Sequence, residues 1–356
     1  MMKKSFSVLL ITVFLLLSLL PSLGMPIFGA SPLLANESAV RTPALTGKDG
    51  KLNMDFLTEL TDYMGSRFAL RPYMVSARSF LYEKLLRSSA EEQVVLGSGG
   101  QLYYSSTLDD YCGRALSDGE LAQIADRLLT IQAATEARGA QFLFTVAPNK
   151  NSLIPEGMPA RFPAGHDQSN WSRLLPMLKE RGVHTVDLHS VLAGNADLYY
   201  RTDSHWTAEG AAIAADALLG ALGRESAFAA GPFSEDGLHV GDLYQMLYPV
   251  GKGREAELVY APGHAHETAS DPRGGNAITI RTSSSAGTGT LYCRRDSFGI
   301  ALYPYLADAF EQAEFSRSSD WSEDSFSTLD ADVIILEIVE RSIPSLLGED
   351  ASGGGS

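Results

Sequence analysis

The chain has 356 residues, 45% of them hydrophobic and 20% charged, a composition typical of a globular protein and incompatible with wholesale disorder. Its length suits one large domain or two smaller ones. The formal net charge of −15 at pH 7 argues against a general nucleic-acid-binding protein, because neutralising phosphates on a large scale requires an excess of basic side chains. A local basic pocket remains compatible with this charge.

Residues 1–35 have the layout of an export signal. Two lysines precede an apolar run from about Phe6 to Leu20, and small residues suited to cleavage follow near Ala30 and Ala35. The apolar run is also long enough to remain as an uncleaved membrane anchor. Both readings place the working part of the chain outside the cytoplasm, either secreted or held at the outer face of the cytoplasmic membrane.

The next segment, residues 36–90, is predicted to be a helical lead-in. Its stretch FLTELTDYMGSRFALRPYM has apolar residues at helical spacing and is expected to break at Pro72. The main domain is predicted over residues 91–345. Residues 346–356, which end in SGGGS, are interpreted as a flexible tail.

Helices alternate with apolar strands along the main domain. QVVLGSGGQLYY predicts two short strands around a Gly-rich turn. The spacing of apolar residues then predicts helices over 118–139, 170–181, 207–222 and 300–313, and strands over 141–148, 183–189, 289–295 and 332–339. This alternation predicts an α/β fold of three αβα layers around a mostly parallel sheet, with a β-rich insertion over 237–282.

Sites in such sheets form beyond the carboxyl ends of the strands, where loops lead into helices. Four polar segments meet this criterion: APNK at 147–150, RTDSHW at 201–206, RRDSFG at 294–299 and EIVERS at 337–342. We therefore expect these segments to lie near one another and to contain the functional residues.

The third segment places Ser297 where a strand turns into a helix. The unpaired backbone N–H groups at the start of a helix suit an oxyanion, and the Ser297 N–H is the first candidate donor. A serine nucleophile needs a base and a group that orients the base. His205 and Asp203, two residues apart on the same sheet edge, can supply both.

Spacing alone leaves other readings of these residues open. Asp203 could cap the following helix, and His205 could be a half-buried loop residue fixed by Trp206. Lys150 and Arg341 at strand ends could hold substrate hydroxyls or charges, or lie on the surface, where Glu340 could pair with Arg341.

The ordered segments YYRTDSHWTAEGA and RRDSFGIALYPYL resemble the DHHW and alginate O-acetylation group of SGNH-hydrolase-like proteins, over about residues 37–345. Ser204 departs from the second letter of DHHW, at a position that need not be catalytic. The resemblance implies Ser297 as nucleophile, His205 as general base and acid, and Asp203 as its orienter. It also implies a place near the substrate for Tyr303, for which packing in the core is an equally open reading. Trp206 is a further candidate for substrate contact, and Asn149 is a candidate second oxyanion donor.

Proteins of this group carry an acetyl group on serine and pass it to a sugar hydroxyl or to water. The resemblance therefore implies an O-acetyltransferase or acetylesterase acting on a cell-surface or secreted polysaccharide, beside a membrane-bound O-acyltransferase partner. A non-catalytic glycan-binding or assembly protein and a secreted lipase-like hydrolase are the alternatives. An acidic glycan would require basic side chains to form a positive cleft, whereas a neutral or aminosugar polymer would not; the cleft candidates are Arg201, Arg294, Arg295, Lys150 and Arg341.

No metal or other cofactor is expected. His264-Ala-His266 is the only metal-like local pair and is interpreted as a solvated loop, because the sequence shows no third ligand. Cys112 and Cys293 could pair in an exported protein, but their spacing alone does not decide it.

Overall fold

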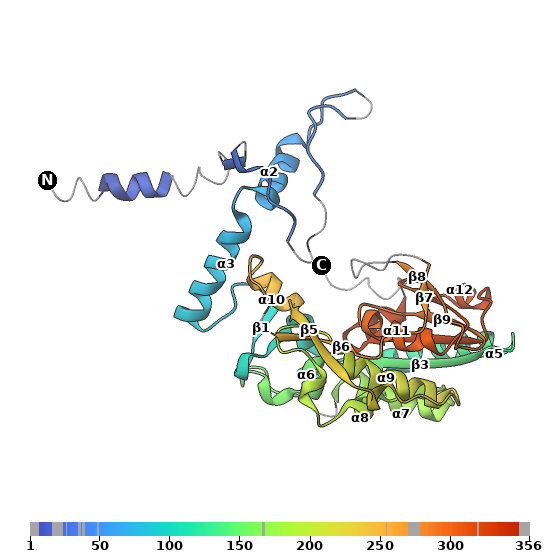
Figure 1. The fold of residues 1–356 in the computed structure, drawn as a ribbon. Helices are drawn as coiled ribbons and strands as arrows, with labels where there is room; N and C mark the ends of the chain where they lie inside the picture. The colour runs from blue at the N-terminus through green and yellow to red at the C-terminus, as the bar shows by residue number, and fades with distance from the viewer. Residues whose placement is uncertain are drawn as a thin grey trace. The chain divides into compact units, whose positions relative to one another are not determined.

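The computed structural model describes residues 7–15, 24–25, 27–34, 37, 40–47, 50–165, 168–253, 255–269, 278–318 and 320–348 (Figure 1). Contacts divide the chain into two units, residues 1–95 with 240–253 and residues 96–239 with 254–356. Of the predicted export signal, residues 7–15 are helical, whereas residues 16–23 and Ala35 lie outside the described ranges. Within those ranges, no helix has the length and apolar character needed to cross a membrane.

The smaller unit is mainly helical. Its helices are α2 (Phe56–Arg67), α3 (Arg71–Leu81), the π-helical turn Tyr82–Leu86 and α10 (Asp242–Leu247). The break expected at Pro72 comes earlier, because Leu70 adopts a left-handed conformation with φ of 64° and Pro72 then lies in the first turn of α3. Proline is well tolerated there, since the first helical N–H groups have no intrahelical acceptor. The helix α10 falls inside a stretch that was expected to be rich in β structure.

The larger unit contains a central sheet of seven described strands in the order β4-β3-β11-β9-β10-β8-β7. These strands are β3 (Gln141–Ala147), β4 (Thr185–Val186), β7 (Glu267–Thr268), β8 (Thr279–Ser283), β9 (Thr290–Arg294), β10 (Gln312–Ser316) and β11 (Val333–Val339). From β4 to β10 the neighbours pair in parallel, while β8 and β7 extend one edge antiparallel. The predicted parallel sheet is therefore confirmed.

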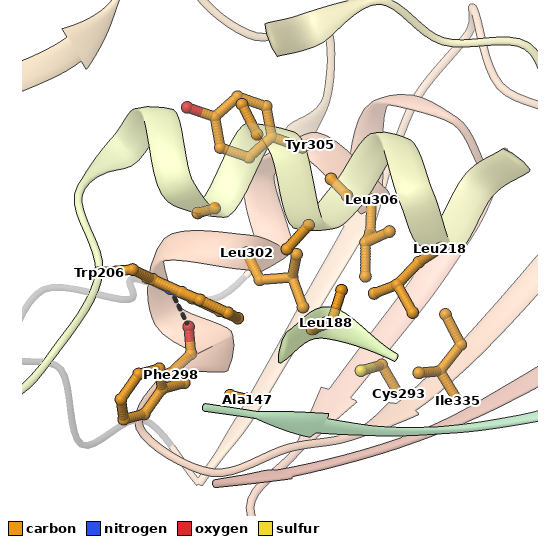
Figure 2. Close-up of a cluster of buried hydrophobic side chains, with 14 of the residues drawn as sticks. Ala147, Leu188, Trp206, Leu218, Cys293, Phe298, Leu302, Tyr305, Leu306 and Ile335 are labelled. Atoms are coloured by element: carbon orange, nitrogen blue, oxygen red, sulfur yellow. Dashed lines mark hydrogen bonds between the residues drawn. The ribbon is translucent and has the colours of Figure 1, made fainter. Parts of the chain in front are cut away.

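Helices cover both faces of this sheet, as the alternating pattern predicted. The main ones are α5 (Asp118–Glu136), α7 (Asn170–Arg181), α8 (Leu188–Leu192), α9 (Ala208–Ala221), α11 (Gly299–Asp308) and α12 (Glu323–Ser327). Successive residues of β11 alternate between two buried clusters: Ile335 packs with α8, α9 and α11, and Ile334 packs with α5, α7 and α12. Figure 2 shows the first cluster, with Leu218, Leu302 and Leu306 above the sheet.

Several boundaries differ from those that the sequence predicts. β4 ends at Val186 because the Asp187 side chain caps α8 by accepting the Ser190 N–H. The helix expected to reach residue 313 ends at Asp308, and the following residues form β10, which the pattern did not indicate.

The stretch expected to be rich in β structure divides between two sheets. β5 (Phe233–His239) and β6 (Glu255–Tyr260) pair with each other, while β8 joins the central sheet. Two further short strands, β1 (Val94–Leu96) and β2 (Leu102–Tyr104), flank the Gly-rich turn as predicted.

Candidate active site

Ser297 lies in the turn between β9 and α11, and the end of β11 holds that turn in place. The Asp296 carboxylate accepts the Phe298 N–H at 2.8 Å and the Val339 N–H at 2.6 Å. The Asp296 N–H in turn donates to Glu337 at 3.1 Å. These bonds fix the turn to a rigid strand, so the Ser297 hydroxyl has a defined position at the start of a ten-residue helix.

Gly299 is required for this tight turn. A Cβ atom at this position would lie 2.5 Å from Cδ and 2.6 Å from Cβ of Arg295, closer than carbon atoms can approach. The Arg295 side chain is almost fully buried and cannot easily move aside. The glycine therefore lets the first turn of α11 pack directly against the end of β9.

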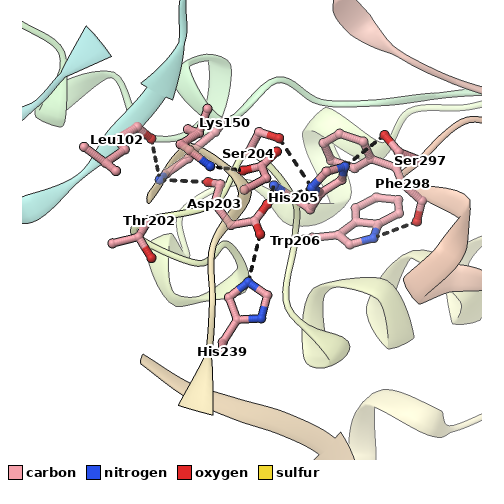
Figure 3. Close-up of polar contacts among 12 residues, drawn as sticks. Leu102, Lys150, Thr202, Asp203, Ser204, His205, Trp206, His239, Ser297 and Phe298 are labelled. Carbon is pink, nitrogen blue, oxygen red and sulfur yellow. Dashed lines mark hydrogen bonds and ion pairs between the residues drawn. The ribbon is translucent and has the colours of Figure 1, made fainter. Parts of the chain in front are cut away.

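The segments around Ser297 and His205 meet, although the two residues are 92 positions apart. His205 Nε2 lies 2.9 Å from Ser297 Oγ, and His205 Nδ1 lies 2.7 Å from Asp203 Oδ1 (Figure 3). The same carboxylate oxygen accepts the His205 backbone N–H at 2.9 Å. Asp203 thus holds the Nδ1–H tautomer of His205, in which Nε2 carries the lone pair that accepts the serine proton.

Trp206 joins the loop that carries His205 (residues 201–206, the histidine loop) to the turn that carries Ser297 (residues 295–298, the serine turn). Its indole N–H donates to the Phe298 carbonyl at 3.1 Å, and its side chain is only 1% exposed (Figure 2). Thr207 caps α9 through the Gly210 N–H, which sets where the loop ends. The substrate-binding role expected of Trp206 does not fit this burial, so its structural role is to position the loop.

Lys150 has a similar structural role. Its ammonium group donates to the carbonyls of Leu102 at 2.8 Å, Arg201 at 2.7 Å and Asp203 at 3.2 Å. The residue is only 4% exposed. These bonds tie the backbone of Arg201 and Asp203 to Leu102, so the described contacts of Lys150 favour a structural role over the expected contact with substrate.

Asn149 and Arg341 also come from strand ends. The Asn149 N–H donates to Glu340 at 2.8 Å, and its buried side-chain oxygen has no hydrogen-bond partner among the described residues. The Arg341 guanidinium lies 5.4 Å from the Tyr104 ring centre and 5.6 Å from that of Phe298. Both side chains therefore remain candidates for substrate contact beside the serine turn.

Glu340 does not make the surface pair with Arg341 that was considered. It is buried, accepts the Ser152 hydroxyl at 2.6 Å and lies 3.1 Å from His189 Nε2. Although burial favours the neutral acid, the contacts with His189 and Ser152 lower the pKa of Glu340. Its role is to hold the loop after β3 in place.

Tyr303 packs away from these residues. Its ring lies 5.8 Å from that of His266 and 5.5 Å from that of Phe315, in the partly buried layer around the hydrophobic core. The described contacts thus favour the packing role for Tyr303 over the predicted place near the substrate.

Two residues that the sequence pattern did not indicate extend the hydrogen-bonded chain. His239 Nε2 lies 2.8 Å from Asp203 Oδ2, and His239 Nδ1 lies 2.5 Å from Glu257 Oε2. Tyr200 stacks on the His239 ring with centroids 3.7 Å apart and donates its hydroxyl to Glu257 at 3.2 Å. His239 lies on β5 and Glu257 on β6, and neither strand carries a local motif that indicates a functional residue.

A second buried acid lies beside the serine turn. Glu337 is fully buried on β11, and burial, followed by the charge of Asp296, raises its pKa well above the usual range. Glu337 therefore favours the neutral acid, while the Asp296 side chain beside it receives the two backbone N–H groups.

His264, His266 and Asp308 form the one cluster in the larger unit's described part with enough ligand atoms close together to hold a metal ion. Both histidine Nδ1 atoms lie 2.8 Å from Asp308 oxygens. Asp308 also accepts the backbone N–H groups of Ala265 and His266. Although burial favours the neutral acid, these bonds hold the pKa of Asp308 far below its usual range. The carboxylate is thus already occupied in anchoring its loop.

The two cysteines are free thiols in the structure, and Cys293 is buried within β9. Burial raises the pKa of the Cys293 thiol. The Cys293 thiol is therefore a core side chain and not a nucleophile.

Comparison with known proteins supports the predicted group. Residues 94–258 match the family described as "SGNH hydrolase-like domain, acetyltransferase AlgX". This span contains His205 and Asp203 but ends before Ser297. A probable alginate O-acetylase AlgJ from Pseudomonas syringae pv. tomato is 25% identical over 281 residues, which cover 71% of this chain and 69% of that protein.

Two solved structures share the fold. A DHHW family protein from Eubacterium siraeum superposes with a TM-score of 0.51 at 17% identity, covering 73% of this chain and 97% of that one. PatB1 from Bacillus cereus gives a TM-score of 0.50 at 14% identity, covering 64% of this chain and 91% of that one. These two structures show that the chain has the same fold, and the family match over residues 94–258 and the AlgJ relative show that it is similar in sequence to the SGNH hydrolase-like proteins AlgX and AlgJ.

Proposed function

We propose that this protein is an extracytoplasmic O-acetyltransferase or acetylesterase that works through an acetyl-serine intermediate on a cell-surface or secreted polysaccharide. The main observation that supports this proposal is the continuous series of contacts from Asp203 through His205 to Ser297, at the start of a helix. A serine, a base and an orienting acid at these distances are what acyl transfer requires.

The first half of the reaction forms the intermediate. Ser297 Oγ attacks the acetyl carbonyl carbon while His205 Nε2 takes the hydroxyl proton. The C–O bond to the donor then breaks as the His205 imidazolium returns this proton to the leaving oxygen. The Asp203 carboxylate stabilises the imidazolium between these two events.

The second half reverses the roles. His205 removes a proton from an acceptor hydroxyl, whose oxygen attacks the acetyl carbonyl and releases Ser297. A sugar hydroxyl gives transfer, and water gives hydrolysis.

The Ser297 N–H is the first donor we assign to the oxyanion, because it has no acceptor in the part of the chain that the structure describes. Asn149 is the second donor that we propose. It follows β3, which neighbours β11, and its side-chain NH₂ group, the donor that this role requires, makes no hydrogen bond within the described residues.

The acceptor that we propose is a polysaccharide, on the strength of the AlgJ relative, whose name specifies alginate. With a net charge of −15, this chain needs local cations to accept a polyanion such as alginate. Arg294, Arg295 and Lys150 do not serve this purpose, because each is at most 4% exposed. Arg201 and Arg341 remain, so we favour a neutral or weakly charged polymer.

The decisive experiment incubates the purified chain with a chromogenic acetyl ester and compares wild type with Ser297→Ala and His205→Ala. We expect both variants to lose at least about 10³-fold in kcat/KM. Ser327→Ala is the matched control, because that hydroxyl only donates to the Asp324 carbonyl on α12. Wild-type activity that survives in Ser297→Ala would instead support a non-catalytic glycan-binding protein.

Transferase and esterase are separated by adding candidate acceptors to the same assay. Acetyl groups that appear on a glycan in place of free acetate identify a transferase. Free acetate at an unchanged rate identifies an esterase.

A further inference from the structure

Asp203 is shared by two histidines that occupy its two oxygens. Oδ1 faces His205, and Oδ2 faces His239 Nε2 at 2.8 Å. On its other side, the His239 ring meets Glu257 Oε2 at 2.5 Å. Figure 3 shows His239 on the side of Asp203 opposite the serine. The series of contacts therefore runs from Glu257 through His239, Asp203 and His205 to Ser297.

The contacts of the two rings require different protonation states. Both nitrogens of His239 face carboxylate oxygens, which only accept hydrogen bonds, so both nitrogens must carry a proton. His205 has a carboxylate on one side and a hydroxyl donor on the other, which suits a neutral ring. His239 is thus a fixed cation, and His205 is the mobile base.

The surroundings of His239 support this cation. Its side chain is 18% exposed, and the Tyr200 ring covers one face. Although burial favours the neutral ring, the hydrogen bonds to Asp203 and Glu257 raise the pKa of His239 to about 9. The hydrogen bond to His239 is the main cause of the lowered pKa of Glu257.

A second carboxylate on β6 binds the same loop. Glu255 accepts the N–H groups of Arg201 at 2.5 Å and Thr202 at 2.7 Å. The β5–β6 pair thus supports the segment that carries Asp203 through Glu255, Glu257 and His239. The charged and titratable groups that face His239 within the larger unit are Asp203, Glu257 and Tyr200.

We propose that His239, held between Glu257 and Asp203, is a positioning residue that fixes the Asp203 carboxylate and lowers the pH range over which His205 acts as a base. This inference rests on the proposed function. The cation offsets part of the Asp203 charge, so the His205 imidazolium is stabilised less than it would be by Asp203 alone. His205 consequently stays neutral, and able to accept the serine proton, at lower pH.

The test is His239→Gln, which can keep a donor toward Asp203 but carries no charge. We expect kcat/KM for a small acetyl ester at pH 7 to fall about 10-fold or more, and the acid limb of its pH profile to move up by about half to one pH unit. Glu257→Gln should move the limb in the same direction by less. His184→Gln, which breaks an exposed pair with Glu136, is the matched control and should leave both kcat/KM and the acid limb of the pH profile unchanged.

A purely structural role predicts lower activity with an unmoved acid limb, and that result would overturn the proposal. A second readout needs no activity: ¹⁵N NMR of histidine-labelled protein should show one ring with two protonated nitrogens at pH 7.5 that is missing in His239→Gln. A neutral His239 ring would also overturn the proposal. If wild type matches Ser297→Ala in the ester assay, the proposed function fails, and the NMR result still decides the state of His239.

Discussion

Replacing Asp203 with Asn tests the arrangement of the site most sharply, because the substitution changes one acceptor into a donor without changing shape. The Asp203 carboxylate accepts hydrogen bonds from His205 N at 2.9 Å, His205 Nδ1 at 2.7 Å and His239 Nε2 at 2.8 Å. An Asn side chain has one oxygen and one NH₂ group, so one side must now face a donor.

Each orientation of the Asn amide has a different cost. If its NH₂ faces His205, the ring adopts the wrong tautomer and Nε2 no longer accepts the serine proton. If its NH₂ faces His239, that ring must lose a proton, which for a pKa of about 9 leaves on the order of 1% of molecules competent at pH 7. Solvent screening and the lost Asp203 charge reduce this penalty.

We therefore expect Asp203→Asn to lose about 10³–10⁴-fold in kcat/KM at pH 7, counting also the lost stabilisation of the His205 imidazolium. The deficit relative to wild type should shrink as the pH rises towards 9 and His239 becomes neutral. Asp203→Ala offers no amide to the two rings and should show no such recovery.

The assay is the pH dependence of acetyl-ester hydrolysis from pH 6.5 to 9.5, with Ser297→Ala subtracted as the chemical background. A loss below about 10-fold, or the same pH dependence for Asp203→Asn and Asp203→Ala, would show that Asp203 does not set the protonation of the two histidines.

Three further predictions concern stability. Lys150→Met removes the donor shared by the carbonyls of Leu102, Arg201 and Asp203, two of them in buried bonds, and should lower the free energy of unfolding by about 2–4 kcal/mol, read from urea unfolding; an unchanged midpoint would contradict this role. Gly299→Ala places a methyl group against Arg295 and should cost about 1–3 kcal/mol by the same measurement, whereas Gly220→Ala, where nothing lies near the new Cβ, should cost nothing. His239 has a folded-state pKa of about 9 against an ordinary value of 6.5, so its contribution is complete below pH 6.5 and is lost as the pH rises through 9. After allowance for solvent screening, the free energy of unfolding of wild type should fall by about 1–2 kcal/mol more than that of His239→Gln between pH 6.5 and 9. The same pH dependence of unfolding in both proteins would show that His239 makes no such contribution.

The sequence predicts the layered architecture well because the relevant signals are local. β11 is apolar at every position except Glu337, and α5 begins with a Ser117–Glu120 capping box and carries buried residues at helical spacing. β10 was missed because QAEFS is short and follows an apolar helix without a strong stop signal. α10 was missed because six residues give too little periodicity to distinguish a helix from a strand.

The candidate site likewise contains residues that local motifs indicate and residues that only the folded structure reveals. Ser297, His205 and Asp203 stand in short motifs at strand ends, so a rule about sheet edges brings them together. His239 and Glu257 belong to a separate two-stranded sheet, and only tertiary packing brings them to Asp203. Lys150 and Trp206 were expected to contact substrate because they are polar or aromatic residues near strand ends. In the structure both side chains are buried and donate hydrogen bonds to backbone carbonyls.

The most direct measurement is the intact mass of the protein after brief mixing with an activated acetyl ester, followed by acid quenching and peptide mapping. We expect one added acetyl group, about 42 Da, on the peptide that contains Ser297, and no such group in Ser297→Ala. Turnover of the ester with no label on that peptide, or equal labelling of the Ser297→Ala protein, would contradict a covalent acetyl-serine and the role given to His205.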